Sequence, residues 1–155
     1  MKNKKEVGKA LGLVPSGLFV VTASHGDQED AVLASWVNQC SFAPPALTMV
    51  LSKTRAARLL VEASESFVVN VLEKEGEVMK KFFAPNKADV FDGLKTKKVG
   101  KRPRILSDAV SWLECKVINT IPAGDHVVYI GEIIDGGVLK GGSPATHVRK
   151  NGFAY

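Results

Sequence analysis

A group of hydroxyl and basic side chains stands directly before a predicted helix. Ser52, Lys53, Thr54 and Arg55 follow an apolar run, and the apolar residues after them recur at helical spacing. The first N–H groups of a helix have no partner within it and, with the macrodipole, attract anions. The group is therefore a candidate site for a phosphate monoester, and Arg58, one turn later, could reach the same anion. An ordinary helix cap with exposed cations explains these residues equally well.

Small and polar side chains form a second group, earlier in the chain. Ala34, Ser35, Asn38 and Ser41 stand among large apolar residues, where a plain core strand would carry Val or Ile. Small residues allow a flat ring to approach a strand, and amide or hydroxyl groups offer hydrogen bonds to its edge. A polar hairpin edge is the alternative, and Trp36 taken alone is more often a core residue than a ligand contact.

Short apolar runs between turn residues predict a mainly β chain with a few helices. Short connections favour antiparallel pairing, and many short strands favour a sheet closed into a barrel. We expect helices over 2–12, over 55–63 with Thr54 as its N-cap, and over 73–83, where Pro85 stops the last helix. The predicted strands cover 18–23, 31–37, 46–51, 66–72, 112–121 and 126–134.

Several local features refine this picture. Residues 39–45 are expected to be a connection, because Pro44 and Pro45 cannot donate to a central ladder. Gly131 is a possible bulge, and residues 86–103 are predicted to be a long loop. The inner face of the helix over 55–63 is assigned to Ala56, Leu59, Leu60 and Ala63.

The composition is that of one soluble domain spanning residues 1–155. No run of 18 apolar residues predicts a membrane span, and the basic start lacks the apolar core of a signal peptide, so the cytoplasm is the expected location. Cys40 and Cys115 are expected to be reduced and buried. No His, Cys or carboxylate spacing resembles a zinc site, so we expect no metal.

The positive charge of the chain, +5 overall, is concentrated in two stretches, 2–5 and 95–104. Nucleic-acid binding requires basic residues interleaved with aromatic ones, and aromatic residues make up only 7% of this chain. Nucleic acid is therefore a disfavoured partner, although a positive field would help to attract a phosphorylated small molecule.

Known catalytic motifs are missing from the sequence. There is no GxGxxG, no Walker motif and no GxSxG. His126, which opens a predicted strand after Ala-Gly-Asp, is a lone histidine, and such residues are most often structural.

Six segments, in this order and spacing, resemble the flavin reductase-like FMN-binding family. The resemblance covers nearly the whole chain and extends to flavoredoxin and to the flavin reductase module fused to some flavodiiron proteins. The segments are GLFVVTA at 17–23, ASWVNQCSFAPPALTMVL at 34–51, SKTRAARLL at 52–60, FVVNVL at 67–72, WLECKV at 112–117 and AGDHVVYIGEI at 123–133.

The resemblance implies an antiparallel split β-barrel with short peripheral helices. It implies non-covalent FMN near the interface of a homodimer, with His126 beside a stacked nicotinamide. It also implies that the tail residues His147 and Tyr155 close the site, either from the same chain or from the partner subunit. The implied FMN-binding residues are Ser35, Trp36, Val37 and Asn38 for the ring and ribityl chain, Ser52, Lys53 and Thr54 for the phosphate with Arg58 in support, and Ala34, Ser41 and Leu51 as further contacts.

Two redox functions fit the resemblance. One is an NAD(P)H-dependent flavin reductase, in which a hydride from NADH or NADPH passes to flavin N5. The other is an electron-transfer flavoprotein that exchanges electrons with a redox protein partner of the rubredoxin or ferredoxin kind. A non-redox FMN-fold or haem-binding module is a third alternative. Hydride transfer needs no side-chain acid or base, so a missing catalytic dyad does not count against an enzyme.

Overall fold

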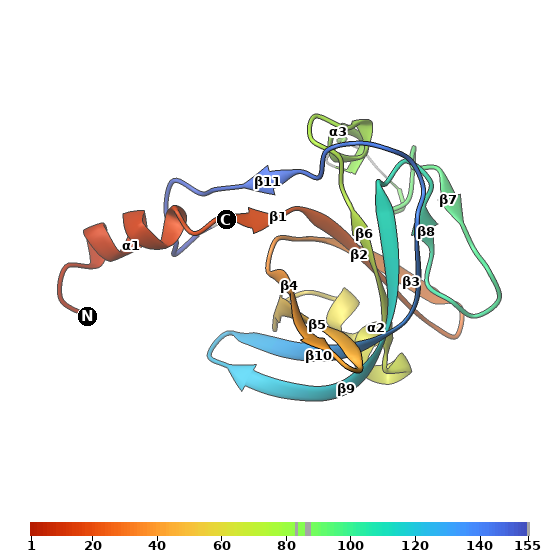
Figure 1. The fold of residues 1–155 in the computed structure, drawn as a ribbon, viewed down its shortest axis with the longest axis horizontal. Helices are drawn as coiled ribbons and strands as arrows, with labels where there is room; N and C mark the ends of the chain where they lie inside the picture. Colours follow the sequence, from red (N-terminus) through yellow and green to blue (C-terminus); the bar gives the residue numbers. More distant parts are fainter. Residues whose placement is uncertain (83, 86–87, 155) are drawn as a thin grey trace.

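A computed structural model describes residues 1–82, 84–85 and 88–154, and within these ranges the chain is mainly β with three helices (Figure 1). The predicted β-rich class is confirmed. The helices are α1 (Lys4–Gly12), α2 (Ala57–Ser64) and α3 (Glu77–Phe82). The strands are β1 (Ser16–Gly17), β2 (Phe19–His25), β3 (Gln28–Ala34), β4 (Val37–Phe42), β5 (Pro45–Ser52), β6 (Ser66–Val71), β7 (Thr96–Lys97), β8 (Ile105–Leu106), β9 (Ser111–Ala123), β10 (His126–Val138) and β11 (Thr146–His147).

Seven strands form the main antiparallel sheet, in the order β3-β2-β6-β9-β10-β5-β4. The predicted hairpin of the first two long strands is confirmed, with Phe19 opposite Ala34 and His25 opposite Gln28. All six predicted strands correspond to strands of this sheet. The predicted irregularity at Gly131 is also present, as a register shift between Ile130 and Gly131.

The two edges of this sheet, β3 and β4, follow one another directly in the chain. Only Ser35 and Trp36 separate them, so the sheet must curl until its edges lie close together. The backbone N–H of Val50 on β5 donates to the carbonyl oxygen of Trp36 at 3.0 Å and fixes this link. Because β3 and β4 are not paired with each other, the observed sheet is open, and the predicted closure into a barrel is not confirmed.

The interpretation of residues 39–45 as a connection is wrong. Residues 37–42 form β4, which pairs with β5 from Val37 opposite Met49 to Phe42 opposite Pro45. The polar sequence of β4 suits an edge strand, since most of its side chains are exposed. Pro44 lies in the turn, and Pro45 is the first residue of its strand, where a proline is tolerated.

Helix α2 begins later than the sequence predicts. Its N-cap position is Ala56, which makes no side-chain cap hydrogen bond, so the assignment of Thr54 as the cap is wrong. The predicted inner face is wrong as well. The buried residues are Ala57, Leu60 and Val61, whereas the side chain of Leu59 is 60% exposed. Apolar residues occupy two adjacent faces of this short helix. Because the helix begins later, the face with Ala57, Leu60 and Val61 packs against the core.

Two apolar clusters form the core on either side of β2. The first joins the main sheet to α2 and includes the fully buried Met49, Val61, Phe67 and Tyr129. The second joins β2 and β3 to α3 and to the segment that follows it. Its buried members are Leu18, Val20, Ala31, Leu72, Val78, Leu106, Ala109 and Ala145, against which Leu33, Met79, Phe82, Val90, Phe91, Leu94 and Leu139 pack.

The segment after α3 is more ordered than the predicted loop. We call residues 88–106 the strap; it contains turns and the short antiparallel pair β7–β8, in which Thr96 lies opposite Leu106. Helix α3 is shorter than the predicted helix over 73–83. The last residue of that prediction, together with 86 and 87 of the predicted loop and Tyr155, lies outside the described residues.

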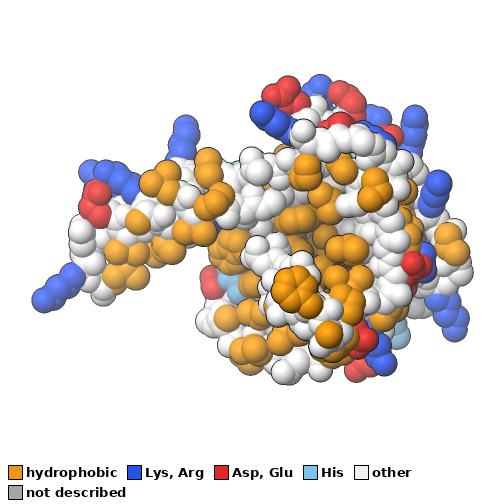
Figure 2. Space-filling view, in the orientation of Figure 1, with side chains coloured by type: hydrophobic (Ala, Val, Ile, Leu, Met, Phe, Trp, Pro, Cys, Tyr) orange, Lys and Arg blue, Asp and Glu red, His pale blue; other side chains and the backbone are white. Residues whose placement is uncertain are grey.

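Helix α1 and the C-terminal segment run together as an arm that extends from the sheet (Figure 1). The N–H groups of Arg149 and Gly152 donate to the carbonyl oxygens of Gly12 and Gly8 at 2.9 and 2.7 Å. A Cβ atom on Gly12 would lie 2.3 Å from the Arg149 oxygen, so this close approach requires glycine. Figure 2 shows hydrophobic side chains over much of this arm, with basic side chains among them.

Candidate functional site

A cavity of about 700 Å³ opens where the two edges of the main sheet meet. Its size lies within the range of small-molecule and cofactor sites. One side is formed by β3, the link Ser35–Trp36, the end of β5 and the start of α2, and the other by α3 and the strap. The lining residues are Leu18, Asp30–Trp36, Val50, Leu51, Ser52, Thr54–Ala57, Met79, Phe82, Val90 and His147.

The hydroxyl groups of Ser52 and Thr54 lie at the α2 end of this cavity. Their oxygen atoms are 3.0 Å apart, and the N–H of Thr54 donates to the Ser52 hydroxyl at 3.3 Å. Arg55 and Ala56 follow in the turn that leads into α2, where backbone N–H groups have no partner within the helix. Hydroxyls, an arginine and a helix N-terminus thus converge at one end of a largely apolar cavity, as an anionic group on an apolar ligand would require.

A second cavity adjoins the first across Trp36. The two share Trp36, Val50, Ser52, Thr54 and Arg55, and the second also reaches the β9–β10 turn and the C-terminal segment. The rings of Trp36 and His126 lie 4.9 Å apart at 49°, and the Arg149 guanidinium lies 5.1 Å from the Trp36 ring centroid. An aromatic plane, an imidazole and two arginines therefore surround a space continuous with the first cavity.

Short contacts fix the turn that carries His126. Its Nδ1 lies 2.7 Å from a carboxylate oxygen of Asp125, and this hydrogen bond holds the pKa of Asp125 below its ordinary value. Lys53 donates to the carbonyl oxygen of Gly124 at 2.6 Å, and its backbone N–H donates to the Asp125 carbonyl at 3.0 Å. Residues 52–54 and the His126 turn consequently act as one unit.

The structure brings together about half of the predicted site residues. Ala34, Ser35, Trp36, Leu51, Ser52 and Thr54 line the first cavity, His147 lines it too, and His126 lines the second. Val37 is buried in the core, while Asn38 and Ser41 lie further along β4. Lys53 points to the Gly124 turn. These last four residues do not line either cavity.

Arg58 is held away from the cavity by partners on its own helix and on β10. Its Nη1 lies 2.6 and 2.8 Å from the two carboxylate oxygens of Glu62, which also accepts a hydrogen bond from the Tyr129 hydroxyl at 2.7 Å. Burial raises the pKa of Tyr129, and the bond to Glu62 raises it further. Arg55, which the sequence grouped with Ser52, Lys53 and Thr54, lines the cavity, whereas Arg58 does not.

Several lining residues carry no recognisable sequence signal. Met79, Phe82 and Val90 read as ordinary apolar residues of a helix and a loop, and their approach to β3 depends on how the strap folds back. Arg149 reads as part of a polar tail. Its contact with Trp36 arises because the C-terminal segment runs beside α1.

The two cysteines differ in their surroundings, and neither forms a disulfide. Cys115 is buried as predicted, and burial raises the pKa of its thiol to about 12. Cys40 lies on the edge strand β4 and is exposed, so the prediction that it is buried is wrong. Within residues 1–82, 84–85 and 88–154, no cluster of three His, Cys, Asp or Glu side chains is arranged to hold a metal ion. No helix in the same part of the chain is long and apolar enough to span a membrane.

Solved structures share this fold over most of their length. The NADH:FAD oxidoreductase SgcE6 of Streptomyces globisporus, in complex with NAD and FAD fragments, superposes with a TM-score of 0.82 at 25% identity, covering 95% of this chain and 89% of that one. The flavin reductase HpaC complexed with NADP+ gives a TM-score of 0.78 at 26% identity, covering 91% and 90%.

The curated sequence relatives are named diflavin flavoproteins. Diflavin flavoprotein A 1 of Synechocystis is 37% identical over 155 residues, which is 97% of this chain but only 27% of that protein. The chain thus spans about a quarter of the length of the curated relatives it matches. Residues 11–153 match the flavin reductase like domain. On this match over most of its length, the chain belongs to the flavin reductase-like domain family.

Proposed function

We propose that the chain binds FMN non-covalently in the first cavity and works as a flavin-dependent oxidoreductase that uses NADH or NADPH. The observation that carries this proposal is the pair of joined cavities. The first is large and mostly apolar, with Ser52, Thr54 and Arg55 at one end. The second is reached across Trp36 and contains His126 and Arg149. We take the curled sheet to be the split barrel that the family resemblance implies.

The lining of the first cavity suits the parts of FMN. Apolar side chains of β3, α3 and the strap would contact the flat ring, and the small residues Ala34 and Ser35 allow it to approach the chain closely. The paired hydroxyls of Ser52 and Thr54 would donate to the phosphate, and Arg55 would supply charge. Lys53 and Arg58 would act indirectly, since other partners already hold them.

The second cavity suits a reduced nicotinamide dinucleotide. The Trp36 and His126 rings offer a face for the nicotinamide, while Arg55 and Arg149 offer charge for its phosphates. When bound, flavin would accept a hydride from the nicotinamide. The chain's own residues need only align the two rings and exclude water. The solved complexes of SgcE6 with NAD and FAD fragments and of HpaC with NADP+ support this assignment.

We further propose a homodimer, as the resemblance implies. Apolar side chains exposed on the arm support this part of the proposal, with Leu13 72% and Val14 60% exposed. Light scattering would test it. We expect the mass of two chains, and the double substitution Leu13→Glu, Val14→Glu should shift the protein toward one chain.

Two measurements on purified protein test the proposed activity. FMN is titrated into the protein, and the FMN-loaded protein is then mixed with NADH or NADPH while flavin absorbance is followed. Saturable binding and bleaching within seconds support the reductase. Binding without bleaching, together with reversible reduction by a redox protein, would favour the electron-transfer alternative. If no FMN binds, the proposed function is wrong.

A further inference from the structure

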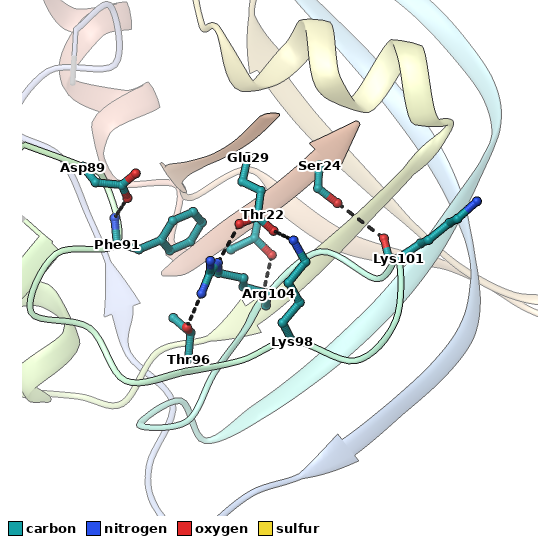
Figure 3. Close-up of polar contacts among 9 residues, drawn as sticks. All are labelled: Thr22, Ser24, Glu29, Asp89, Phe91, Thr96, Lys98, Lys101 and Arg104. Atoms are coloured by element: carbon teal, nitrogen blue, oxygen red, sulfur yellow. Dashed lines mark hydrogen bonds and ion pairs between the residues drawn. The ribbon is translucent and has the colours of Figure 1, made fainter. Parts of the chain in front are cut away.

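The strap contributes to the lining of the first cavity, and a compact polar cluster attaches the strap to β2 and β3 (Figure 3). The strap contributes Val90 to the cavity and Phe91 and Leu94 to the apolar cluster behind it. Asp89 and Asp92 shape its first turn: Asp92 accepts the N–H groups of residues 88 and 89, and Asp89 accepts that of Phe91 at 2.7 Å.

Arg104 stands at the centre of the polar cluster. Its Nε lies 2.8 Å from a carboxylate oxygen of Glu29 on β3, its Nη1 donates to the Thr96 hydroxyl at 3.0 Å, and its guanidinium lies 5.2 Å from the Phe91 ring centroid (Figure 3). Lys98 pairs with the other oxygen of Glu29 at 2.8 Å. We call these five residues the Arg104 cluster.

A hydrogen bond from β2 to the backbone of Arg104 strengthens the attachment of the strap to the sheet. The Thr22 hydroxyl on β2 donates to the carbonyl oxygen of Arg104 at 2.6 Å. The partners of Arg104 come from β3 and from two separate parts of the strap, so a single side chain joins three pieces of chain. The Glu29 side chain is only 13% exposed, so its negative charge must be balanced by its two neighbouring cations, Arg104 and Lys98.

The Arg104 cluster lies directly behind the cavity lining. Glu29 precedes Asp30, and Phe91 follows Val90; Asp30 and Val90 line the cavity from β3 and from the strap respectively. By holding Glu29 and Phe91 at once, Arg104 sets how closely the strap side of the cavity approaches β3. The lining residue Val90 and its neighbours Met79 and Phe82 have no strand ladder to hold them there.

We propose that Arg104 and Glu29 are positioning residues that hold Val90 against the ligand in the first cavity and so set the rate at which flavin leaves. This inference rests on the proposed function, because it needs flavin to be the ligand. It predicts an effect on release rather than on entry or on the phosphate contact. An intact cluster gives a retained cofactor, and a broken one gives a flavin that exchanges with solution.

The experiment compares release of flavin from the full chain and three single variants: Arg104→Met, Glu29→Gln and, as a matched control, Lys101→Met. Lys101 belongs to the same strap, but among the described residues only its carbonyl oxygen is engaged, by Ser24, and its side chain points away from the cluster (Figure 3). Each protein is loaded with FMN and diluted, and release is followed as the recovery of flavin fluorescence. The series is repeated with riboflavin, which lacks the phosphate.

We expect Arg104→Met and Glu29→Gln each to raise the release rate about tenfold, since each removes charge-assisted hydrogen bonds of one cluster. A variant that combines Arg104→Met with Glu29→Gln, measured alongside, should release flavin no faster than about twice the single-variant rate, because both changes break the same contacts. Riboflavin should show the same ratios as FMN, and association rates should stay within about twofold. Lys101→Met should behave like the unsubstituted chain.

Failure of the proposed function and failure of the inference about Arg104 and Glu29 give different results. If the unsubstituted chain binds no flavin, the proposed function fails, and this inference fails with it. If the chain binds flavin and Glu29→Gln releases it at the original rate, only the inference is overturned. An equal acceleration by Lys101→Met would also overturn it, because net charge would then be the cause. Should Arg104→Met fold poorly, Glu29→Gln, which keeps the side-chain shape, decides by itself.

Discussion

The two sides of the first cavity are built in different ways. We call one side the strand wall; it consists of Asp30–Trp36, Val50–Ser52 and Thr54–Ala57. The strand wall is held by the backbone hydrogen bonds of β3 and β5 and by the buried core behind them. The opposite side, the strap with α3, rests on apolar packing and on a few side-chain contacts between distant residues. The contrast teaches that one side of the cavity belongs to the folding core, whereas the other can loosen while the core stays intact.

The largest effect on the strand wall should come from a substitution in the core that supports it. Met49 alternates with the lining residue Val50 on β5 and is fully buried, so Met49→Ala leaves a cavity in the first core cluster. We expect the free energy of unfolding, measured with urea, to fall by about 2–5 kcal/mol. The control Val138→Ala, at a residue that is 80% exposed, should change it little. A Met49→Ala loss as small as that of the control would show that the wall is not part of the core.

The next largest effect should come from the charged end of the strand wall. Arg55→Ala removes the arginine that faces the cavity, and FMN binding should weaken by about 1.5–3 kcal/mol, roughly tenfold to a hundredfold in Kd. Arg58→Ala is the control on the same helix, because Glu62 already holds that side chain. It should lower stability and leave Kd within about twofold. The reverse pattern, a larger loss of affinity with Arg58→Ala, would restore Arg58 as the phosphate ligand.

Acid should loosen the strap before it affects the strand wall. Burial alone would raise the pKa of Glu29, but the hydrogen bonds and charges of Lys98 and Arg104 outweigh it and hold that pKa below its ordinary value. Glu29 therefore stabilises the fold above about pH 4.3, and this contribution is lost as the pH falls through the lower, folded-state pKa.

The corresponding measurement compares Tm for the unsubstituted chain and for Glu29→Gln. At pH 7 the variant should be less stable by on the order of 1 kcal/mol, and the gap should narrow as the pH falls through the lowered pKa of Glu29, because the protonated side chain resembles glutamine. A gap that stays constant across this pH range would mean that the charge of Glu29 contributes nothing to the fold.

The smallest effect should come from chemical modification of the two cysteine thiols. Cys40 is exposed on β4, whereas Cys115 is buried and the pKa of its thiol is raised to about 12. Because the thiolate is the reactive form, iodoacetamide at pH 8 should modify Cys40 only, with little effect on Tm, and Cys115 should react after unfolding in urea. Mass spectrometry of peptides would show this order. Early modification of Cys115 would mean that the core opens readily.

The strand wall was largely predictable from the sequence, and the strap was not. Short apolar runs between turn residues marked β5, β6, β9 and β10, and the small residues near Ser35 marked a place where a flat ring could approach the chain, although the break between β3 and β4 was not predicted. The strap depends on contacts such as that between Arg104 and Glu29, which are 75 residues apart and leave no periodic signal. The basic run at 95–104 therefore read as a solvated loop, although Arg102 pairs with Glu114 at 2.6 Å and Arg104 with Glu29 at 2.8 Å.

Errors within the strand wall have a local physical origin. The start of α2 moved because the turn formed by Ser52 and Thr54 consumes the residues that looked like a cap, and this shift carried Arg55 rather than Arg58 to the cavity. β4 was missed because an edge strand whose side chains are exposed on both faces carries polar residues that resemble a loop. Family resemblance supplied the identity of the ligand, which the residue pattern alone leaves as an anion with an apolar body.

The link Ser35–Trp36 also governs where this chain can change in length. One residue inserted there would turn every side chain of β4 to the opposite face, and the carbonyl of Trp36 would lose its place opposite Val50. The tight turn at Gly26 bears no such constraint, because added residues there can bulge into solvent. Insertions and deletions among related chains should therefore be found at that turn and spare the two-residue link.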